Sequence, residues 1–230
     1  MSLYAWVILL SVLGPFLLSF DKKVAFFREW KYLFPATGIV FVIFVVWDSF
    51  FTSKQIWGFN PAYLSGKYMA NLPIEEVLFF VVIPYCCLFI HQVLKAYFPS
   101  VKLLKITHYF AFTLVLAGFI FGATHLHQWY TVTVTFLTSL VTIGVYFVYK
   151  KSWYPQFVFT YLVCLIPFII VNSILTGSFT PSPIVWYAEN HIMGIRIFTI
   201  PVEDLFYNYL LLLPIVYWFE TFKSKKSTSN

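Results

Sequence analysis

Charged residues are scarce in this sequence. Asp, Glu, Lys and Arg together make up 10% of the 230 residues, whereas hydrophobic residues make up 60% and aromatic residues 23%. A soluble domain carries about a quarter of its residues as charged side chains, which cover its surface. The composition therefore excludes a water-soluble globule, and it predicts a protein whose solvent is lipid.

Several cofactor and ligand signatures are also missing. The three cysteines, Cys86, Cys87 and Cys164, lie in apolar runs without CxxC or CxxCH spacing, which excludes a disulfide framework and haem attachment. No Gly-x-Gly-x-x-Gly follows a strand pattern, and His125 and His127 belong to no metal-ligand motif. The net charge of +6 comes from scattered basic residues, which argues against a nucleic-acid partner. We therefore expect no metal and no bound cofactor.

Seven apolar runs approach the length needed to cross a bilayer as a helix, which is about 20 residues. They are residues 3–20, 33–52, 75–94, 106–124, 129–149, 156–176 and 201–220. A β-barrel would require alternating strands, whereas residues 40–47 are continuously apolar. The first run has no preceding Lys or Arg and is interpreted as a permanent helix rather than a cleaved signal. The sequence predicts an all-α integral membrane protein with seven transmembrane helices in the bilayer of the cell membrane.

The 15 Lys and Arg residues predict the orientation. Twelve of them fall in alternate loops and the C-terminal tail, at Lys22, Lys23, Arg28, Lys31, Lys95, Lys102, Lys105, Lys150, Lys151, Lys223, Lys225 and Lys226. The other loops hold three, namely Lys54, Lys67 and Arg196. Because basic loops stay in the cytoplasm, the C-terminus is predicted to be cytoplasmic and the N-terminus outside.

Three short motifs occur twice in the same order. The pairs are residues 31–35 and 151–155 (Lys-x-x-x-Pro), residues 48–52 and 172–176 (Asp or Asn, then Ser-x-x-Thr), and residues 73–76 and 201–204 (Pro-x-Glu-Glu or Pro-x-Glu-Asp). This pattern predicts two parallel three-helix repeats joined by a connector helix. The predicted division is 1–95, first repeat; 96–128, connector helix (span four); 129–222, second repeat; and 223–230, a basic tail. Within the connector, Gly118 and Gly122 form a small-xxx-small pattern, typical of close packing inside a bundle or of a homo-oligomer seam.

Four of the nine acidic residues lie in the repeated proline motif, as Glu75, Glu76, Glu203 and Asp204. Acids after a proline also suit an ordinary helix start, because they complement the free N–H groups there. That interpretation does not require two adjacent acids in a chain with so few. Ionisable residues near a membrane interior are costly and mark functional sites by default. Asp48 and Asn172 precede the two acid pairs at equivalent positions and join them as candidates.

With this motif pair, the preceding Asp48 and Asn172, and its length, the chain resembles the small membrane-embedded lycopene cyclases. These occur as two three-helix subunits, as a fused chain, and as the cyclase half of a fungal bifunctional enzyme. The resemblance covers nearly the whole chain. It implies redox-neutral cyclisation of the ends of lycopene to β-ionone rings, which gives γ-carotene and then β-carotene. Relatives act on longer carotenoids or make ε-rings.

The residue types suit such chemistry. Ring closure needs a proton for an alkene, a stabilised carbocation, and a base for a second proton, and paired carboxyl groups can divide these tasks. We expect Glu75 and Glu203 to be the principal catalytic residues, with Glu76, Asp204 and Asp48 in support. Aromatic faces attract cations by about 0.5–2 kcal/mol. We expect a substrate site lined by Asn172, Trp47, Phe50, Trp57, Phe79, Phe80, Phe206 and Tyr207, although interfacial aromatic belts give the same pattern.

Other functions fit part of the sequence. A proton-coupled transporter would also carry repeats and intramembrane acids, but it needs polar residues in mid-span, and these are few. A retinal-type photoreceptor needs a lysine in the seventh span, and residues 201–220 contain none. A non-catalytic carotenoid-binding subunit stays open. The expected partners are a lipophilic carotenoid and the lipid bilayer.

Overall fold

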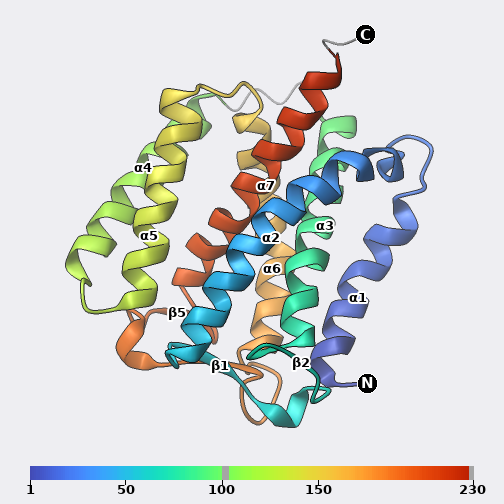
Figure 1. Cartoon of the computed structure of the whole chain (residues 1–230). Coiled ribbons are helices and arrows are strands. Elements are labelled where there is room, and N and C mark those ends of the chain that lie inside the picture. The colour runs from blue at the N-terminus through green and yellow to red at the C-terminus, as the bar shows by residue number, and fades with distance from the viewer. Residues whose placement is uncertain (100–103, 228–230) are drawn as a thin grey trace. The chain divides into compact units, whose positions relative to one another are not determined.

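The computed structural model describes residues 1–99 and 104–227 and is dominated by helices (Figure 1). Its α-helices are α1 (Leu3–Leu18), α2 (Trp30–Ser53), α3 (Ile74–Tyr97), α4 (Leu104–Thr124), α5 (Trp129–Thr142), α6 (Tyr154–Leu175) and α7 (Glu203–Ser227). A π-helical segment, Ile143–Val148, continues α5, and 3₁₀ turns occupy Phe26–Glu29, Pro61–Tyr63 and Glu189–His191. Lys102 and the last residues of the predicted basic tail lie outside the described residues.

Six of these helices are long and apolar enough to cross a membrane, with α5 counted together with its π-helical continuation to Val148. They correspond to the second through seventh predicted spans, and the chain is a multi-pass membrane protein. Helix α1 is apolar but has 16 residues, fewer than a perpendicular span of the hydrocarbon core needs. Prolines lie inside five of the helices: Pro15 in α1, Pro35 in α2, Pro84 in α3, Pro167 in α6 and Pro214 in α7. Such prolines are tolerated in membrane helices because neighbouring groups satisfy the freed carbonyls.

The prediction that the chain contains no strands is wrong for two loops. Six short strands form three two-stranded antiparallel sheets. Strands β2 (Tyr68–Met69) and β3 (Leu72–Pro73) pair just before α3, and β5 (Arg196–Ile197) and β6 (Ile200–Pro201) pair just before α7. Each hairpin turn begins with a residue in the left-handed region, Ala70 with φ 54° and Phe198 with φ 56°. Runs of two residues carry no alternation, so the sequence pattern could not reveal them.

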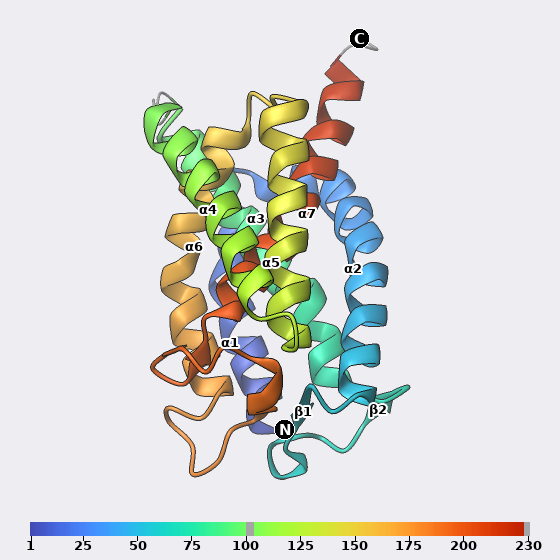
Figure 2. The same ribbon diagram turned by 90° about the vertical axis from the view of Figure 1, so that its left-hand side faces the viewer.

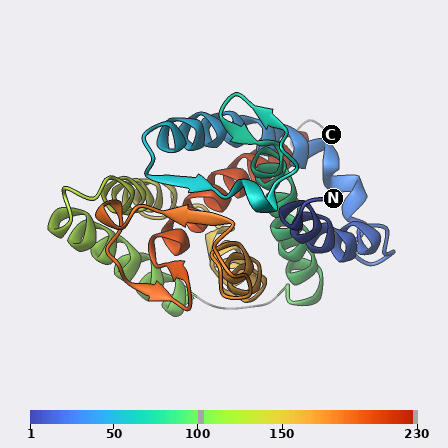
Figure 3. The ribbon, with the colours of Figure 1, turned by 90° about the horizontal axis from the view of Figure 1, so that it is seen from below.

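The third sheet pairs β1 (Trp57–Phe59) with β4 (Val185–Tyr187). Gly58 lies opposite Trp186, and the flanking bonds run from Asn60 N–H to the Ile184 carbonyl and from Ala188 N–H to the Ile56 carbonyl. The repeated proline motifs at residues 73 and 201 are 128 residues apart, and the same offset takes residues 56, 58 and 60 to 184, 186 and 188. The two flanking hydrogen bonds are therefore equivalent, and the pairing is symmetric about Gly58 and Trp186. Figure 3 shows the two strands side by side. A Cβ atom on Gly58 would lie 2.6 Å from Cε2 of the Trp186 indole, which explains glycine at the centre.

Contacts divide the chain into two compact units. Unit 1 takes its described residues from 1–50, 61–101 and 211–230, and unit 2 takes them from 51–60 and 102–210. Each unit thus contains a short segment from the other part of the sequence, and the predicted division into two repeats and a connector stays a prediction.

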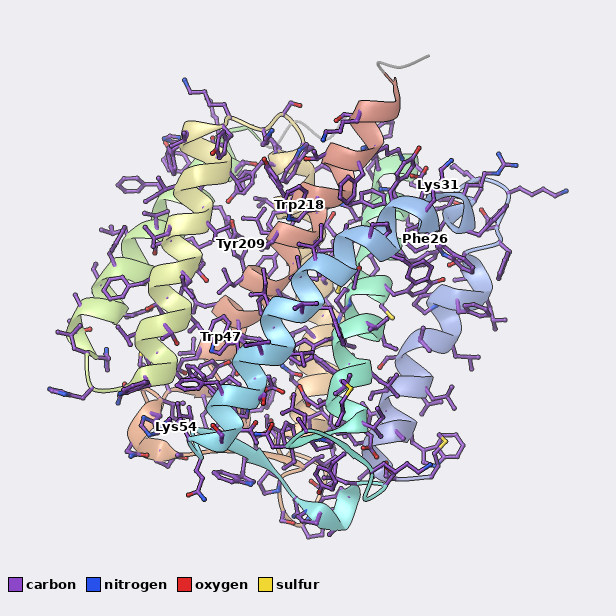
Figure 4. The ribbon with its side chains drawn as sticks, in the orientation of Figure 1. Phe26, Lys31, Trp47, Lys54, Tyr209 and Trp218 are labelled. Atoms are coloured by element: carbon purple, nitrogen blue, oxygen red, sulfur yellow. The ribbon has the colours of Figure 1, made fainter. Side chains whose placement is uncertain are left out.

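In unit 1, helix α1 packs against α3. Phe26, labelled in Figure 4, is fully buried and lies edge-on to Tyr85 and Phe89 of α3. Towards the C-terminal ends of α3 and α7, Glu220 accepts from Lys95 Nζ at 2.8 Å and lies 3.5 Å from Nε2 of the buried His91. Apolar packing and these charge pairs hold the unit together.

In unit 2, helices α4 and α5 lie side by side along most of their length (Figure 2). The predicted small-xxx-small pattern forms this contact. A Cβ atom on Gly118 would lie 2.7 Å from the Thr135 carbonyl, and one on Gly122 would lie 2.9 Å from the Phe136 ring. Glycine is needed here for close approach within the bundle, the first of the two interpretations of this pattern.

Candidate active site

The two acid pairs occupy the first turns of α3 and α7. In each case a two-residue hairpin and a proline precede the helix, so the chain enters it in a fixed direction. All four side chains are buried. A buried ionisable group must find partners, and those partners define each site.

In unit 1, Glu75 is 1% exposed and its Oε1 atom accepts two hydrogen bonds. The Ser2 hydroxyl donates at 2.6 Å and the Ser65 backbone N–H donates at 2.7 Å. Ser2 also caps α1, because its Oγ accepts from the Ala5 N–H at 3.2 Å. The start of α1 and the loop before α3 thus hold the same carboxyl oxygen.

The second acid of unit 1, Glu76, is held by a phenol. Tyr4 is buried and donates its hydroxyl to Glu76 Oε2 at 2.5 Å. The Tyr4 ring lies 6.4 Å from that of Phe79, which in turn lies 6.1 Å from Phe80. Glu76 is therefore anchored beside a group of aromatic side chains.

The same arrangement occurs in unit 2 around Glu203, which is 0% exposed. The Thr131 hydroxyl and the Met193 backbone N–H both donate to Glu203 Oε1 at 2.6 Å. Met193 lies ten residues before Glu203, just as Ser65 lies ten residues before Glu75. A hydroxyl at the start of a helix and a loop amide again converge on one oxygen.

Asp204 accepts from two phenols. Tyr130 donates to Oδ1 at 2.6 Å and Tyr187 donates to Oδ2 at 2.9 Å. The two phenol rings are stacked 5.8 Å apart, and Trp57 lies edge-on to Tyr130 at 5.0 Å. These residues form an aromatic wall beside the acid pair of unit 2.

The other oxygen of each glutamate has a different environment. Glu75 Oε2 and Glu203 Oε2 are buried and have no hydrogen-bond partner among the described residues. An amide N–H can only donate, so Oε1 is fixed as an acceptor. Because Oε1 already accepts two hydrogen bonds, a proton on either glutamate fits best on Oε2, which has no partner among the described residues. This geometry suits proton transfer between the carboxyl group and an apolar molecule.

The other predicted residues of unit 1 lie on α2 and α3. Asp48 is buried on α2, one residue after Trp47, whose ring lies 5.5 Å from Phe44 (Figure 4). Phe44 in turn lies 6.1 Å from the buried Phe80. Phe50 is 46% exposed, the most exposed of the predicted aromatic residues.

In unit 2, Phe206 is buried with its ring 6.2 Å from Phe121 on α4. Tyr207 lies edge-on to Trp57 at 6.0 Å and joins the aromatic wall. Asn172 is half-buried near the end of α6, and its carbonyl accepts from the Thr176 hydroxyl at 2.7 Å. Tyr207 therefore lies beside Tyr130, which holds Asp204, whereas the described hydrogen bond of Asn172 lies at the end of α6.

The residues that hold the carboxyl groups were not predicted. They are Ser2, Tyr4, Tyr130, Thr131, Tyr187 and the backbone amides of Ser65 and Met193. One signal was present in the sequence, because a hydroxyl residue and a tyrosine lie close together at the start of the first apolar run (Ser2 and Tyr4) and at the start of the fifth (Thr131 and Tyr130). The amides have no sequence signature, since every residue except proline supplies one.

Comparison with known proteins assigns the family. The lycopene cyclase family model matches residues 1–94 and 127–222, which is most of the chain. Neither curated proteins nor solved structures give a match. The matched segments include both acid pairs and every residue that holds them. The chain therefore belongs to the lycopene cyclase family, with the carotenoid cyclase role that this family carries.

Proposed function

We propose that this protein is a lycopene β-cyclase that starts ring closure by protonation. The observation that carries the proposal is the buried, unpartnered Oε2 atom of Glu75 and Glu203, next to a fully hydrogen-bonded Oε1. A polyene offers no hydrogen-bonding group, so a carboxyl oxygen that faces it must find its other partners within the protein. The cradle around each Oε1 supplies them.

The proposed reaction balances without an oxidant or reductant. The O–H bond of a neutral carboxyl breaks, and its proton adds to the terminal alkene of the ψ-end. The adjacent carbon becomes a cation, and a second alkene attacks it to form the six-membered ring. Loss of a proton from the ring to a carboxylate restores a double bond and gives the β-ring. Hydrogen bonds to Oε1 strengthen as charge develops on the donor carboxyl, which lowers the barrier.

The second acid of each pair supports the first. Glu76 and Asp204 are fixed in place by phenol hydroxyls. The aromatic wall of Trp57, Tyr130 and Tyr207 offers ring faces to a cation but contains no strong nucleophile. Exclusion of water protects the cation from capture as an alcohol.

We infer that residues 1–95 and 129–222 are two parallel repeats and that α4 is their connector. Three observations support this inference: the repeated hydrogen bonds around Glu75 and Glu203, the symmetric pairing about Gly58 and Trp186, and the family match in two segments on either side of α4. The basic loops support a cytoplasmic C-terminus and an outer N-terminus in the cell membrane. The bilayer would then supply the lipophilic substrate directly.

Expression in a lycopene-accumulating bacterium, followed by chromatography of the pigments, tests the proposal. We expect γ-carotene and β-carotene from the wild-type protein and uncyclised lycopene from Glu75→Gln and Glu203→Gln. The matched control is Asp21→Asn, which removes an exposed carboxylate from the loop after α1 and should retain activity. Unchanged lycopene beside wild-type protein that accumulates in the membrane would contradict the assignment. Full activity of both glutamine variants would contradict the mechanism.

A further inference from the structure

Tyr187 joins the acid pair of unit 2 to an open pocket. Its hydroxyl donates to Asp204 Oδ2 at 2.9 Å, and the same side chain lines a pocket of about 310 Å³. The remaining pocket wall comes from the loop between α6 and α7, and it includes Thr176, Glu189, Arg196 and Thr199. Asp204 itself is buried and is not among the residues that line the pocket. Tyr187 therefore contacts the acid and also lines the pocket.

The pocket is lined by both polar and apolar side chains and lies beyond the membrane helices. All of its lining residues fall between Leu175 and Glu203, the limits of two candidate spans. Arg196 pairs with Glu189 at 2.6 Å and donates to the Thr199 carbonyl at 2.8 Å, and the Glu189 side chain is 71% exposed. A water molecule occupies about 30 Å³ in the liquid, so the pocket has room for several waters with polar partners.

We propose that Tyr187 is a proton relay that keeps the acid pair of unit 2 in exchange with water. A hydronium ion in the pocket gives a proton to the phenol oxygen, while the phenol's own proton passes to the Asp204 carboxylate. The products are water, an unchanged phenol and a neutral carboxyl, so atoms and charge balance. The reverse sequence returns the proton. Tyr187 is a positioning residue in this scheme, because it contacts Asp204 and not the substrate.

The chain contains its own contrast to this relay. The symmetric pairing of β1 and β4 makes Phe59 the counterpart of Tyr187, since the two positions are 128 residues apart. Phenylalanine has no hydroxyl and cannot pass a proton. The relay is thus a property of the second acid pair, and the two pairs differ in their access to water at this position.

The relay has a measurable consequence that rests on the proposed cyclase function. Cyclisation takes up one proton and releases another, so a closed site could reuse the same proton from one turnover to the next. A site that exchanges with water instead places a solvent hydrogen in each new ring. In D₂O, deuterium per ring therefore reports exchange, whereas the amount of product reports catalysis.

The experiment uses the full chain in liposomes with lycopene and D₂O, and mass spectrometry of the products. For the wild-type protein we expect nearly one deuterium per ring over many turnovers. In Tyr187→Phe we expect at least threefold less deuterium per ring. Phe59→Tyr is the matched control and should give the wild-type label. Val185→Phe narrows the pocket while keeping the Tyr187 hydroxyl, and it should also lower the label. A purely structural defect would reduce the number of rings but not the deuterium in each.

A second readout does not depend on turnover. The infrared C=O stretching band of the protonated Asp204 carboxyl can be assigned by its loss in Asp204→Asn. On transfer to D₂O this band should shift at least threefold more slowly in Tyr187→Phe than in the wild-type protein. Equal deuterium per ring, or equal shift rates, would overturn the relay. A wild-type protein that forms no ring contradicts the proposed function, while the shift rates still decide the relay.

Discussion

Replacement of Thr131 by valine removes one defined hydrogen bond at the candidate site. Valine has nearly the shape of threonine, so the buried start of α5 keeps its packing while Glu203 Oε1 loses the hydroxyl donor at 2.6 Å. The Met193 N–H stays as the second donor. The substitution therefore tests whether the hydroxyl serves catalysis or only the fold.

The expected size follows from how the hydrogen bond changes during proton transfer. A hydrogen bond to a neutral acceptor contributes about 0.5–1.5 kcal/mol, and one to a charged acceptor contributes about 1.5–3 kcal/mol. As Glu203 gives up its proton, the bond from Thr131 passes from the first class to the second. The difference, about 1–1.5 kcal/mol, is lost from the transition state and corresponds to about a tenfold lower kcat.

The assay is the initial rate of ring formation from lycopene in liposomes, with Thr131→Ser as the control that restores the hydroxyl. We expect Thr131→Val to lower kcat about tenfold with little change in KM, and Thr131→Ser to stay within about twofold of the wild-type protein. Ser2→Ala should act similarly on Glu75, whose Oε1 accepts the Ser2 hydroxyl. Equal rates for the valine and serine variants would refute the reasoning.

Five further substitutions test the packing and the buried charges, with thermal unfolding in detergent as the measurement. Gly58→Ala forces a Cβ atom into the Trp186 indole across the strand pair and should lower the free energy of unfolding by about 1–3 kcal/mol. Gly38→Ala is the control, because a Cβ atom there meets nothing within 4 Å, and it should be neutral or stabilising by up to about 1 kcal/mol. Gly118→Val should lower Tm by several degrees, because its side chain would collide with the backbone of α5. Glu220→Gln should destabilise more than Lys95→Met, because Glu220 also faces the buried histidine of α3 while the Lys95 side chain is 43% exposed. Equal stability of Gly58→Ala and Gly38→Ala would contradict this account, as would a larger loss of stability in Lys95→Met than in Glu220→Gln.

Most of the fold could be predicted from hydrophobicity, because membrane helices are long and their apolar runs are continuous. The predicted and observed helices differ most where two residues decide whether a helix can cross the bilayer. Helix α1 ends at Leu18, whereas the apolar run predicts an end at residue 20. The prediction also fails in the loops, where β1 and β4 pair across 128 residues of sequence. Such contacts depend on how the helices place the loops, and no local pattern of two or three residues encodes them.

The four buried acids of the site were found from their repetition and their rarity. Their partners were not, because Ser2, Thr131 and Tyr187 belong to residue types that are common in loops and at helix ends. The two loop amides could not be found at all, since any side chain could stand at those positions. The choice between the two oxygens of Glu203 is likewise a matter of three-dimensional arrangement and not of residue type.

The make-up of the two compact units limits how this polypeptide could be divided. Unit 2 includes residues 51–60, and unit 1 includes the described part of 211–230, so each is completed by a stretch encoded far from the rest of it. A cut in the connection between α3 and α4 would leave both fragments short of part of their own core. Two such pieces, co-expressed, should acquire their structure only by exchanging these stretches, and either piece made alone should be degraded.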